Sequence, residues 1–344
     1  MRYRGIHYDA GVQFSPKRLT RVDFDEDLVR RELETIAGSL HANAVRIVGE
    51  DPARLAYAAR TSIDLGLAVY LSPWLVDRGE AELGPYLVGC AAIAEQLRRS
   101  GGDVTLVVGC ELSLFMHGVL PGETVYERIE WLRSRRDGDQ SGPATAAIGA
   151  SLGEALTRLV PLVRESFGGP VTYASGQWEI VPWELFDIVA VDLYRSGQSD
   201  DGYRRRLRSS MRPGKPFVIT EIGCCTYVGA DLKGGLGWDG VDEWRDGGPA
   251  WLLAEPPARS EATQAAYLLE QLDVFASENV DGVFVYTLVA PYLPTHTDPW
   301  LDFDMSSFAL AKTLPAAQEG ELPWRPKEAF HAVAGFYERL ARGG

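Results

Sequence analysis

Two glutamates stand where apolar runs of this 344-residue sequence end. Glu111 follows the run VTLVVGC, and Glu221 follows PFVIT. Burying a carboxylate is costly unless the group is paired with a partner or used in chemistry. A structural salt bridge would explain one such residue. Two of them at equivalent places indicate a pair of carboxyl groups that carries out acid, base or nucleophilic chemistry.

The two runs fit the fourth and seventh of eight predicted strands. In a closed barrel of parallel strands these two face each other across the mouth, so the carboxyl groups of Glu111 and Glu221 are expected about 5 Å apart. A retaining glycosidase uses that separation, because one carboxylate attacks the anomeric carbon while the other group protonates the leaving oxygen. The two roles need opposite protonation states, which the surroundings of each group must set.

Short β-branched runs alternate with longer helical patterns along the whole chain, as in repeated βα units. Asp51 and Pro52 have the residue types of a helix N-cap and first helical position. The first βα junction, DAGVQFSPKR, lacks the G-x-G-x-x-G turn of a dinucleotide-binding open sheet, and no cofactor is predicted. The sequence predicts an α/β fold, a single (β/α)8 TIM barrel domain over residues 1–344. Its strands are expected at 3–11, 42–49, 67–75, 103–112, 170–178, 187–195, 216–225 and 281–290, and its helices at 23–40, 51–66, 83–100, 143–167, 200–211, 262–278 and 327–341.

Three βα connections are unusually long, at 113–142, 226–261 and 291–326, after the fourth, seventh and eighth strands. Such loops rise over the carboxyl-terminal face, where barrel enzymes hold their active sites. A tryptophan in a loop can simply fix that loop to the barrel, but a group of them predicts an aromatic-walled pocket for sugar rings or another flat apolar ligand. The loops carry Trp131, Trp238, Trp244, Trp251, Trp300 and Trp324, and strand ends carry Trp74 and Trp178.

The placement of the two glutamates resembles that in the clan-A glycoside hydrolases, a superfamily of (β/α)8 retaining glycosidases. Glu111 in VVGCEL and Glu221 in VITEIG match its strand-four and strand-seven glutamates. The resemblance implies that Glu111 is the general acid/base and Glu221 the nucleophile. It also implies that Arg46 in AVRIV lies near the nucleophile and that Tyr194 in VDLYR hydrogen-bonds it. An arginine there would keep Glu221 ionised by Coulombic attraction.

Three positions depart from the clan-A pattern. Cys110 stands where the pattern has an asparagine that holds the 2-hydroxyl group of the sugar. Asp192 replaces the histidine of His-x-Tyr, and Tyr286 lies in the region of the strand-eight tryptophan. These residues, together with Trp74 and Trp178, are predicted to contact the substrate. The carboxyl pair is therefore kept, while the groups that should grip a sugar hydroxyl are changed.

His7 and Asp9 form an H-x-D pair on the first predicted strand. The pair is faintly like the H-x-H of metal-dependent hydrolases, which also need histidines on later strands. The predicted fifth and sixth strands contain none, so no metal centre is expected. His7 and Asp9 are instead candidates for the floor of the pocket, with a purely packed role as the alternative.

Composition and charge limit the partners. The net charge of −14 argues against a nucleic-acid partner and fits a neutral or cationic ligand, a small molecule or an oligosaccharide. The amino-terminal residues contain no apolar signal core, and no window approaches about 18 uninterrupted apolar residues, so no membrane partner is expected. The cysteines show no zinc-ligand spacing, which fits a cytoplasmic protein with reduced thiols; they are Cys90, Cys110, Cys224 and Cys225. The oligomeric state has no signal in the sequence.

Three functions are compatible with these features. The first is a retaining glycoside hydrolase that acts on a small soluble glycoside, by exo-action because long loops shape a pocket. The second is a barrel of the same lineage in which Glu111 serves acid/base isomerisation, cyclisation or elimination in small-molecule metabolism. The third is a non-catalytic ligand-binding barrel. The set of Glu111, Glu221, Arg46 and Tyr194 weighs against the third, which a carboxyl separation above about 10 Å would favour.

Overall fold

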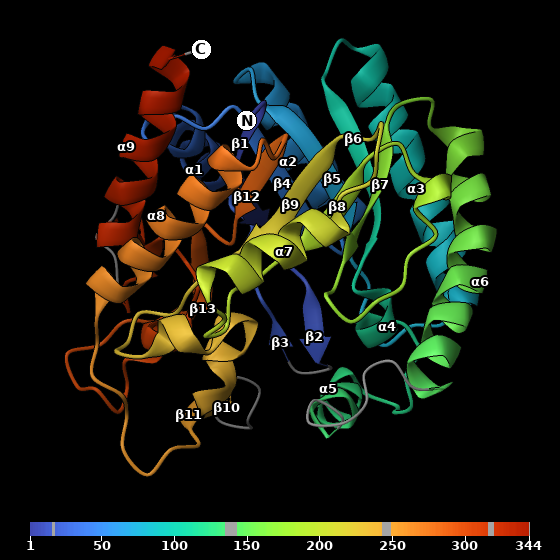
Figure 1. Ribbon diagram of the computed structural model, residues 1–344. Helices are drawn as coiled ribbons and strands as arrows, with labels where there is room; N and C mark the ends of the chain where they lie inside the picture. Colours follow the sequence, from blue (N-terminus) through green and yellow to red (C-terminus); the bar gives the residue numbers. More distant parts are fainter. Residues whose placement is uncertain (16–17, 135–142, 243–248, 316–319, 344) are drawn as a thin grey trace.

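The computed structural model describes residues 1–15, 18–134, 143–242, 249–315 and 320–343 (Figure 1). Parallel strands close into a barrel in the order β1-β12-β9-β8-β7-β6-β5-β4, and β1 pairs with β4 to complete the ring. The predicted (β/α)8 barrel is confirmed. Its strands are β1 (Tyr3–Asp9), β4 (Ala44–Gly49), β5 (Ala68–Pro73), β6 (Val104–Cys110), β7 (Val171–Ser175), β8 (Val189–Asp192), β9 (Phe217–Ile222) and β12 (Gly282–Val285).

Helices surround the barrel, with α9 and α8 on the side opposite α6 (Figure 1). As predicted, the Asp51 carboxylate accepts hydrogen bonds from two backbone amides of the first turn of α2, and Pro52 opens that helix. Between β7 and β8 the chain makes only the 3-10 turn η1 (Trp183–Leu185) and no α-helix. The main helices are α1 (Glu26–Gly38), α2 (Pro52–Asp64), α3 (Glu80–Arg99), α6 (Pro143–Ser166), α7 (Asp200–Ser210), α8 (Glu261–Ser277) and α9 (Glu328–Gly343).

The inside of the barrel is packed at its amino-terminal end. Tyr70 and Phe284 contact each other there, with ring centroids 4.6 Å apart, and Tyr3 packs edge-on against Tyr70. Gly5 makes room for this packing, since a Cβ at that position would lie 2.2 Å from the Phe284 ring. The large rings fill the lower barrel and leave the opposite end for polar side chains, as in a packed TIM-barrel core.

The long connections after β6, β9 and β12 are present as predicted, and in Figure 1 several of their elements gather at one end of the barrel. The predicted strand 281–290 is two strands, because β12 ends at Val285 and β13 begins at Val289, and the Tyr286–Thr287 peptide bond between them is cis. The connections contain α4 (Leu112–Phe115), α5 (Val125–Arg133), η2 (Ala230–Leu232), η3 (Gly234–Gly240), β10 (Val241–Asp242), β11 (Ala250–Trp251), β13 (Val289–Pro294), η4 (Phe303–Ser306), β14 (Ala311–Thr313) and β15 (Trp324–Pro326), and the first βα connection contains β2 (Gln13–Ser15) and β3 (Arg18–Leu19).

By length and composition, one helix among the described residues is apolar enough to cross a membrane, the Ala146–Ser166 part of α6. In the fold this helix covers the barrel beside α3, with Leu152, Leu156 and Val163 fully buried. A core helix of a barrel passes the same test, so the finding is weak evidence for a membrane. The absence of a membrane partner stays a prediction.

Candidate active site

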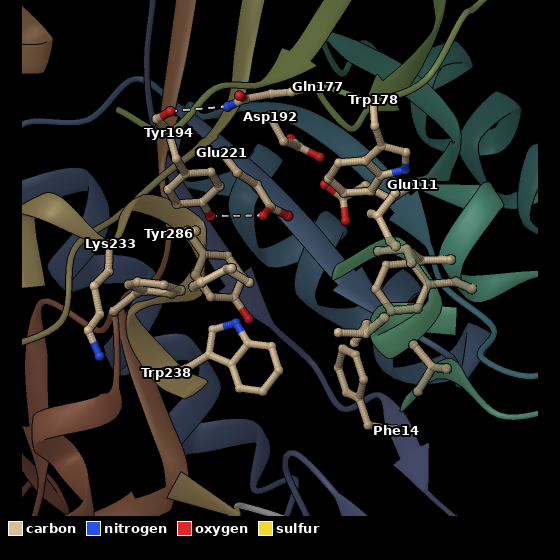
Figure 2. A pocket seen from close by; sticks show the side chains of 18 of the residues that line it. Phe14, Glu111, Gln177, Trp178, Asp192, Tyr194, Glu221, Lys233, Trp238 and Tyr286 are labelled. Carbon is tan, nitrogen blue, oxygen red and sulfur yellow. Dashed lines mark hydrogen bonds between the residues drawn. The ribbon is translucent and has the colours of Figure 1, made fainter. Parts of the chain in front are cut away.

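The carboxyl ends of β6 and β9 open into a cavity of about 750 Å³. Glu111 and Glu221 both line it, and so does Asp192 at the end of β8. Figure 2 shows the carboxyl groups of these three residues converging on the same part of the cavity. The structure therefore brings the two candidate catalytic residues, Glu111 and Glu221, into one cavity.

Glu221 is held by a cation and a phenol. Arg46 Nη1 donates to Glu221 Oε1 at 2.9 Å, and Tyr194 Oη donates to Oε2 at 3.1 Å (Figure 2 shows the second contact). Arg46 is fully buried on β4, and its Nη1 also donates to the carbonyl oxygen of Thr220 at 3.2 Å. Both partners that the resemblance implies for Glu221 are therefore in contact with it.

Glu111 has different surroundings. Its backbone has a φ of 42°, in the left-handed region that side-chain-bearing residues rarely adopt, at the point where β6 passes into α4. Its amide donates to the carbonyl oxygen of Ala174, but its carboxyl group has no hydrogen-bond partner among the described residues. The side chain thus faces the cavity, and among the described residues no direct hydrogen bond stabilises its charge.

The two glutamates differ in the balance of charges around them. Burial raises the pKa of Glu111 well above its usual value, and repulsion from Asp192 and Glu221 raises it further. Burial also raises the pKa of Glu221, but the Arg46 guanidinium and the Tyr194 hydroxyl oppose that rise. Glu221 therefore ionises first, and Glu111 keeps its proton to higher pH.

Asp192 and Cys110 both lie next to Glu221. The Cys110 thiol donates to Asp192 Oδ2 at 3.5 Å and lies 3.9 Å from Glu221 Oε1. Asp192 is paired across the sheet with Glu221, after a register irregularity between Val191 and Asp192. Burial and repulsion from Glu221 raise the pKa of Asp192 well above its usual range, and burial keeps the Cys110 thiol neutral by raising its pKa.

Cys110, Asp192 and Glu221 could each offer a metal ligand atom, since these atoms lie within 4.8 Å of one another. Arg46 already occupies this cluster, with Nη1 2.9 Å from Glu221 Oε1 and 3.7 Å from Asp192 Oδ1. Because a metal ion would have to share the cluster with a guanidinium, its donor set fits an arginine better than a divalent cation. The expectation of no metal centre stays a prediction.

The first strand contributes Asp9 to the cavity lining but not His7. His7 is fully buried, with Nδ1 3.3 Å from Thr287 Oγ1 and its ring against that of Tyr286. Burial and the nearby Arg46 lower the pKa of His7 well below its usual value, so the ring is neutral. His7 thus has the packed role that was the alternative to the pocket floor. Cys110, a predicted substrate contact, does not line the cavity because it is buried, and neither does Arg46, which lies against Glu221 as the resemblance implies.

Four tryptophans line the cavity: Trp74, Trp131, Trp178 and Trp238. Tyr286 also lines the cavity, and in Figure 2 it lies close to Tyr194 and Glu221. The other loop tryptophans that the structure describes, Trp251, Trp300 and Trp324, do not. The Trp324 indole donates to Glu32 in the core and that of Trp251 to the carbonyl oxygen of Pro299, while Trp300 is half exposed; Trp244 lies outside the described residues. The predicted aromatic wall therefore exists, with four of the seven proposed tryptophans that the structure describes.

Sequence reasoning missed Glu179 and Phe308. Glu179 lines the cavity and accepts hydrogen bonds from the Tyr173 hydroxyl at 2.9 Å and from the Ser113 and Gly176 amides. Phe308 packs against Tyr194, with ring centroids 5.7 Å apart. An acidic residue directly after a strand-end tryptophan was the available signal for Glu179, whereas nothing local marks Phe308.

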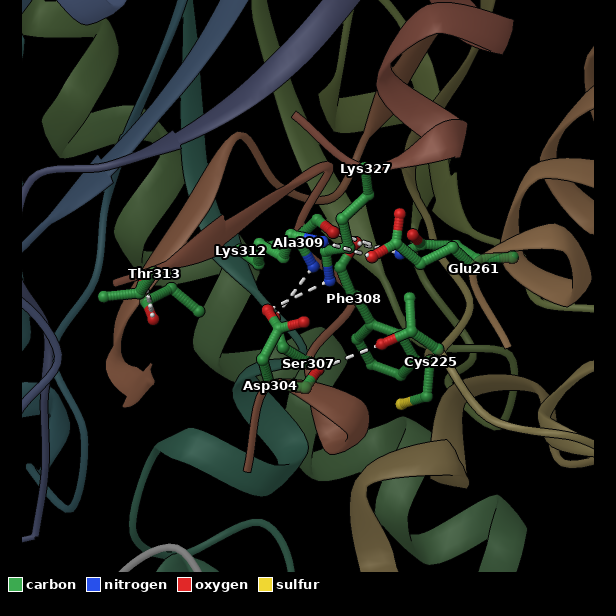
Figure 3. Close-up of polar contacts among 12 residues, drawn as sticks. Cys225, Glu261, Asp304, Ser307, Phe308, Ala309, Lys312, Thr313 and Lys327 are labelled. Atoms are coloured by element: carbon green, nitrogen blue, oxygen red, sulfur yellow. Dashed lines mark hydrogen bonds and ion pairs between the residues drawn. The ribbon is translucent and has the colours of Figure 1, made fainter. Parts of the chain in front are cut away.

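A polar network holds the segment that carries Phe308 (Figure 3). Gln264 donates to the Phe308 carbonyl oxygen at 3.1 Å, and the Cys225 thiol donates to that of Ser306 at 2.9 Å. Lys327, fully buried, forms an ion pair with Asp304 at 3.1 Å. The long connection after β12 is thus fixed against α8 and against the residue that precedes α9, which holds its aromatic residues at the cavity.

Comparisons with known proteins find the fold in solved structures. A GH113 β-mannanase from Alicyclobacillus acidocaldarius, in complex with ManMIm, is 14% identical over 98% of this chain and 97% of its own, with a TM-score of 0.58. An endo-β-1,4-mannanase from Thermotoga petrophila is 12% identical over 99% of this chain and 77% of its own (TM-score 0.50). β-Glucuronidase 2 from Bacteroides uniformis is 13% identical over 98% of this chain, which spans 34% of that protein (TM-score 0.55).

No family model matches the sequence, and no curated protein matches it. At these identities the similarity establishes the shared fold. The resemblance to (β/α)8 glycoside hydrolases that the sequence indicates is thus shown at the level of the barrel.

Proposed function

We propose that this chain is a retaining glycoside hydrolase of the clan-A type, with Glu221 as nucleophile and Glu111 as acid/base. Glu221 Oε attacks the anomeric carbon as the bond from that carbon to the leaving oxygen breaks, and Glu111 gives its proton to that oxygen. Glu111 then takes a proton from a water molecule, whose oxygen displaces Glu221 from the anomeric carbon. The protein is unchanged after both steps.

The main observation behind this proposal is that the two carboxyl groups differ in the contacts that stabilise their ionised forms. Glu221 has Arg46 and Tyr194 as partners, whereas Glu111 has carboxylates near it and, among the described residues, no cation in contact. A nucleophile must be ionised and an acid protonated at the same pH, and this arrangement favours that pair of states. The shared fold with β-mannanases and a β-glucuronidase supports the same assignment.

A panel of aryl glycosides tests the proposal. The expected result is release of the phenol from at least one sugar, with a first-formed sugar product that keeps the anomeric configuration, followed by proton NMR before mutarotation. An inverted product would contradict the double displacement. We expect a short soluble glycoside as substrate, because connections after several strands surround the cavity and favour exo-action.

Replacing Asp192 by asparagine is expected to move the alkaline limb of the pH profile of kcat/KM to lower pH. Asparagine keeps the shape of the side chain but removes its negative charge, so the repulsion that raises the pKa of Glu111 falls. Glu111 then loses its proton at lower pH. The active form, with Glu221 ionised and Glu111 protonated, therefore disappears at lower pH.

The matched control is Asp201→Asn, which removes an exposed carboxylate from α7. Its profile should follow that of the wild type. A profile of Asp192→Asn that coincides with the wild type would remove Asp192 from the electrostatics of the site.

Acid/base isomerisation, cyclisation or elimination is the second candidate. The presence of Asp192 and Cys110, in place of the groups that the clan uses around the sugar, favours it. In that case Glu111 moves a proton and Glu221 forms no covalent bond. If no aryl glycoside in the panel releases its phenol, this second candidate is favoured.

A further inference from the structure

Beside Glu111, the cavity is bounded by apolar side chains that we call the acid-side wall. Its aliphatic members come from α4, α5 and α6: Leu114, Val125, Ile129, Leu132 and Ile148. Its aromatic members are Phe14, Trp74, Phe115, Trp131 and Trp178. These residues belong to one packed cluster, distinct from the layer between the barrel and its outer helices.

The acid-side wall lies on the Glu111 side of the cavity. Leu114 and Phe115 belong to α4, the short helix that begins directly after Glu111, and the Trp178 indole donates to the Ser113 hydroxyl of the same helix at 2.9 Å. Figure 2 places Trp178 and Phe14 on this side, and Tyr286 and Trp238 on the side of Glu221. Because Glu111 protonates the leaving oxygen in the proposed reaction, the departing group must pass along this wall.

A buried arginine fixes the wall in place. Arg128 is fully buried in α5 and donates to the carbonyl oxygens of Leu114 and, at 2.9 Å, Gly122. It also pairs with the Asp77 carboxylate. These contacts join α5 to α4 and to the end of the β5–α3 connection, so the apolar side chains of α5 form a defined part of the site.

Aliphatic side chains are poor partners for a sugar. A second sugar unit would bring several hydroxyl groups, and each that is buried without a hydrogen bond costs binding free energy. Leucine, isoleucine and valine offer no donor or acceptor, although an aromatic ring alone could stack on a sugar. In the wall, Trp74 Nε1 is buried without a hydrogen-bond partner among the described residues.

We propose that the acid-side wall binds an apolar leaving group, an alkyl or aryl alcohol, in the place where a polysaccharide hydrolase would bind a second sugar. The inference rests on the proposed function, since the role of Glu111 defines which end of the substrate meets the wall. It predicts that the natural substrates are glycosides of apolar alcohols, and that oligosaccharides bind less well.

Calorimetric binding of methyl and n-octyl β-D-glucosides and β-D-mannosides tests this inference. The protein is the Glu221→Gln variant, which keeps the wall and prevents turnover, and each octyl glycoside is used below its micelle concentration. We expect the octyl glycoside to bind at least about tenfold more tightly than the methyl glycoside, since each buried methylene contributes up to about fourfold. Cellotriose and mannotriose should bind more weakly than the octyl compounds.

Two added substitutions distinguish the wall from general surface binding. Ile129→Asp introduces a carboxylate at a half-buried position of the wall, and should lower octyl affinity about fivefold or more without changing methyl affinity. The control, Leu162→Asp, makes the same kind of change at an exposed position of α6 outside the cavity and should change neither. Ile129→Ala, a milder truncation, should lower octyl affinity less and guards against misfolding of the aspartate variant.

Equal affinity for octyl and methyl compounds, tighter binding of the trisaccharides, or an equal loss in the Leu162→Asp control would overturn the inference. These outcomes are separate from failure of the proposed function. Octyl-selective binding without hydrolysis of any glycoside would keep the apolar site and remove the hydrolase. Hydrolysis of aryl glycosides without a preference for longer chains would do the reverse.

Discussion

Glu221→Gln is expected to lower kcat/KM on any active aryl glycoside by about three orders of magnitude or more, since the amide cannot attack the anomeric carbon. The fold should persist, because glutamine can still accept from Arg46 through Oε1 and donate to the Tyr194 hydroxyl through Nε2. The loss would therefore report chemistry rather than unfolding. Steady-state kinetics and the melting temperature of both proteins measure the two effects separately.

The nucleophile can also be identified directly. A 2-deoxy-2-fluoro glycoside with a good leaving group should label the wild type and not the Glu221→Gln variant, and the added mass should lie on the peptide that contains Glu221. Glu184→Gln, which changes an exposed glutamate in η1 away from the cavity, is the control and should keep full activity. Undiminished turnover in Glu221→Gln would remove the covalent mechanism.

Much of the site could be predicted from the sequence because its residues stand at the ends of strands. Runs such as VTLVVGC and PFVIT are buried on both faces, so a charged residue directly after them must lie at the mouth of the barrel. Glu111 and Glu221 could therefore be assigned from local pattern. Arg46 and Tyr194 followed from resemblance, and the structure places both on Glu221.

The contact between Cys110 and Asp192 could not be predicted in this way. The sheet register shifts between Val107 and Cys110, and again between Val191 and Asp192, and such irregularities depend on how neighbouring strands pack. Loop residues were equally hard to place. Trp324 and Trp238 both sit in long connections, yet Trp324 is buried against Glu32 and Trp238 lines the cavity. Tertiary packing decides the difference, and local residue type carries no signal for it.

The second large effect is expected when the proposed acid/base residue, Glu111, is replaced. Glu111→Gln removes the proton that the leaving oxygen needs, so glycosides of poorly acidic alcohols should lose about 10²- to 10⁴-fold in kcat/KM. A dinitrophenyl glycoside leaves without help and should lose far less at its first step. Such dependence on the leaving group separates an acid from a residue that merely binds the sugar, whose loss would slow all substrates alike.

The pH dependence of activity tests the role of Glu111 independently. In the wild type, burial and the neighbouring carboxylates hold the pKa of Glu111 high, so activity falls at alkaline pH as this proton is lost. In Glu111→Gln the alkaline limb should disappear, while the acid limb, set by Glu221, remains. An alkaline limb that persists in the variant would assign the proton to another group, with Asp192 the nearest alternative.

Rescue by azide tests the role of Glu111 further, in a Glu111→Gly variant that suits the backbone conformation at position 111. Glycine adopts the left-handed φ of 42° without the strain that a side chain incurs, so Glu111→Gly should fold and leave space beside the anomeric carbon. Azide entering that space needs no base and should attack the glycosyl intermediate on Glu221, which restores turnover with a dinitrophenyl glycoside and gives a glycosyl azide of retained configuration. Because both displacement steps pass through Glu221, an azide product of inverted configuration would mean that Glu221 never carried the sugar.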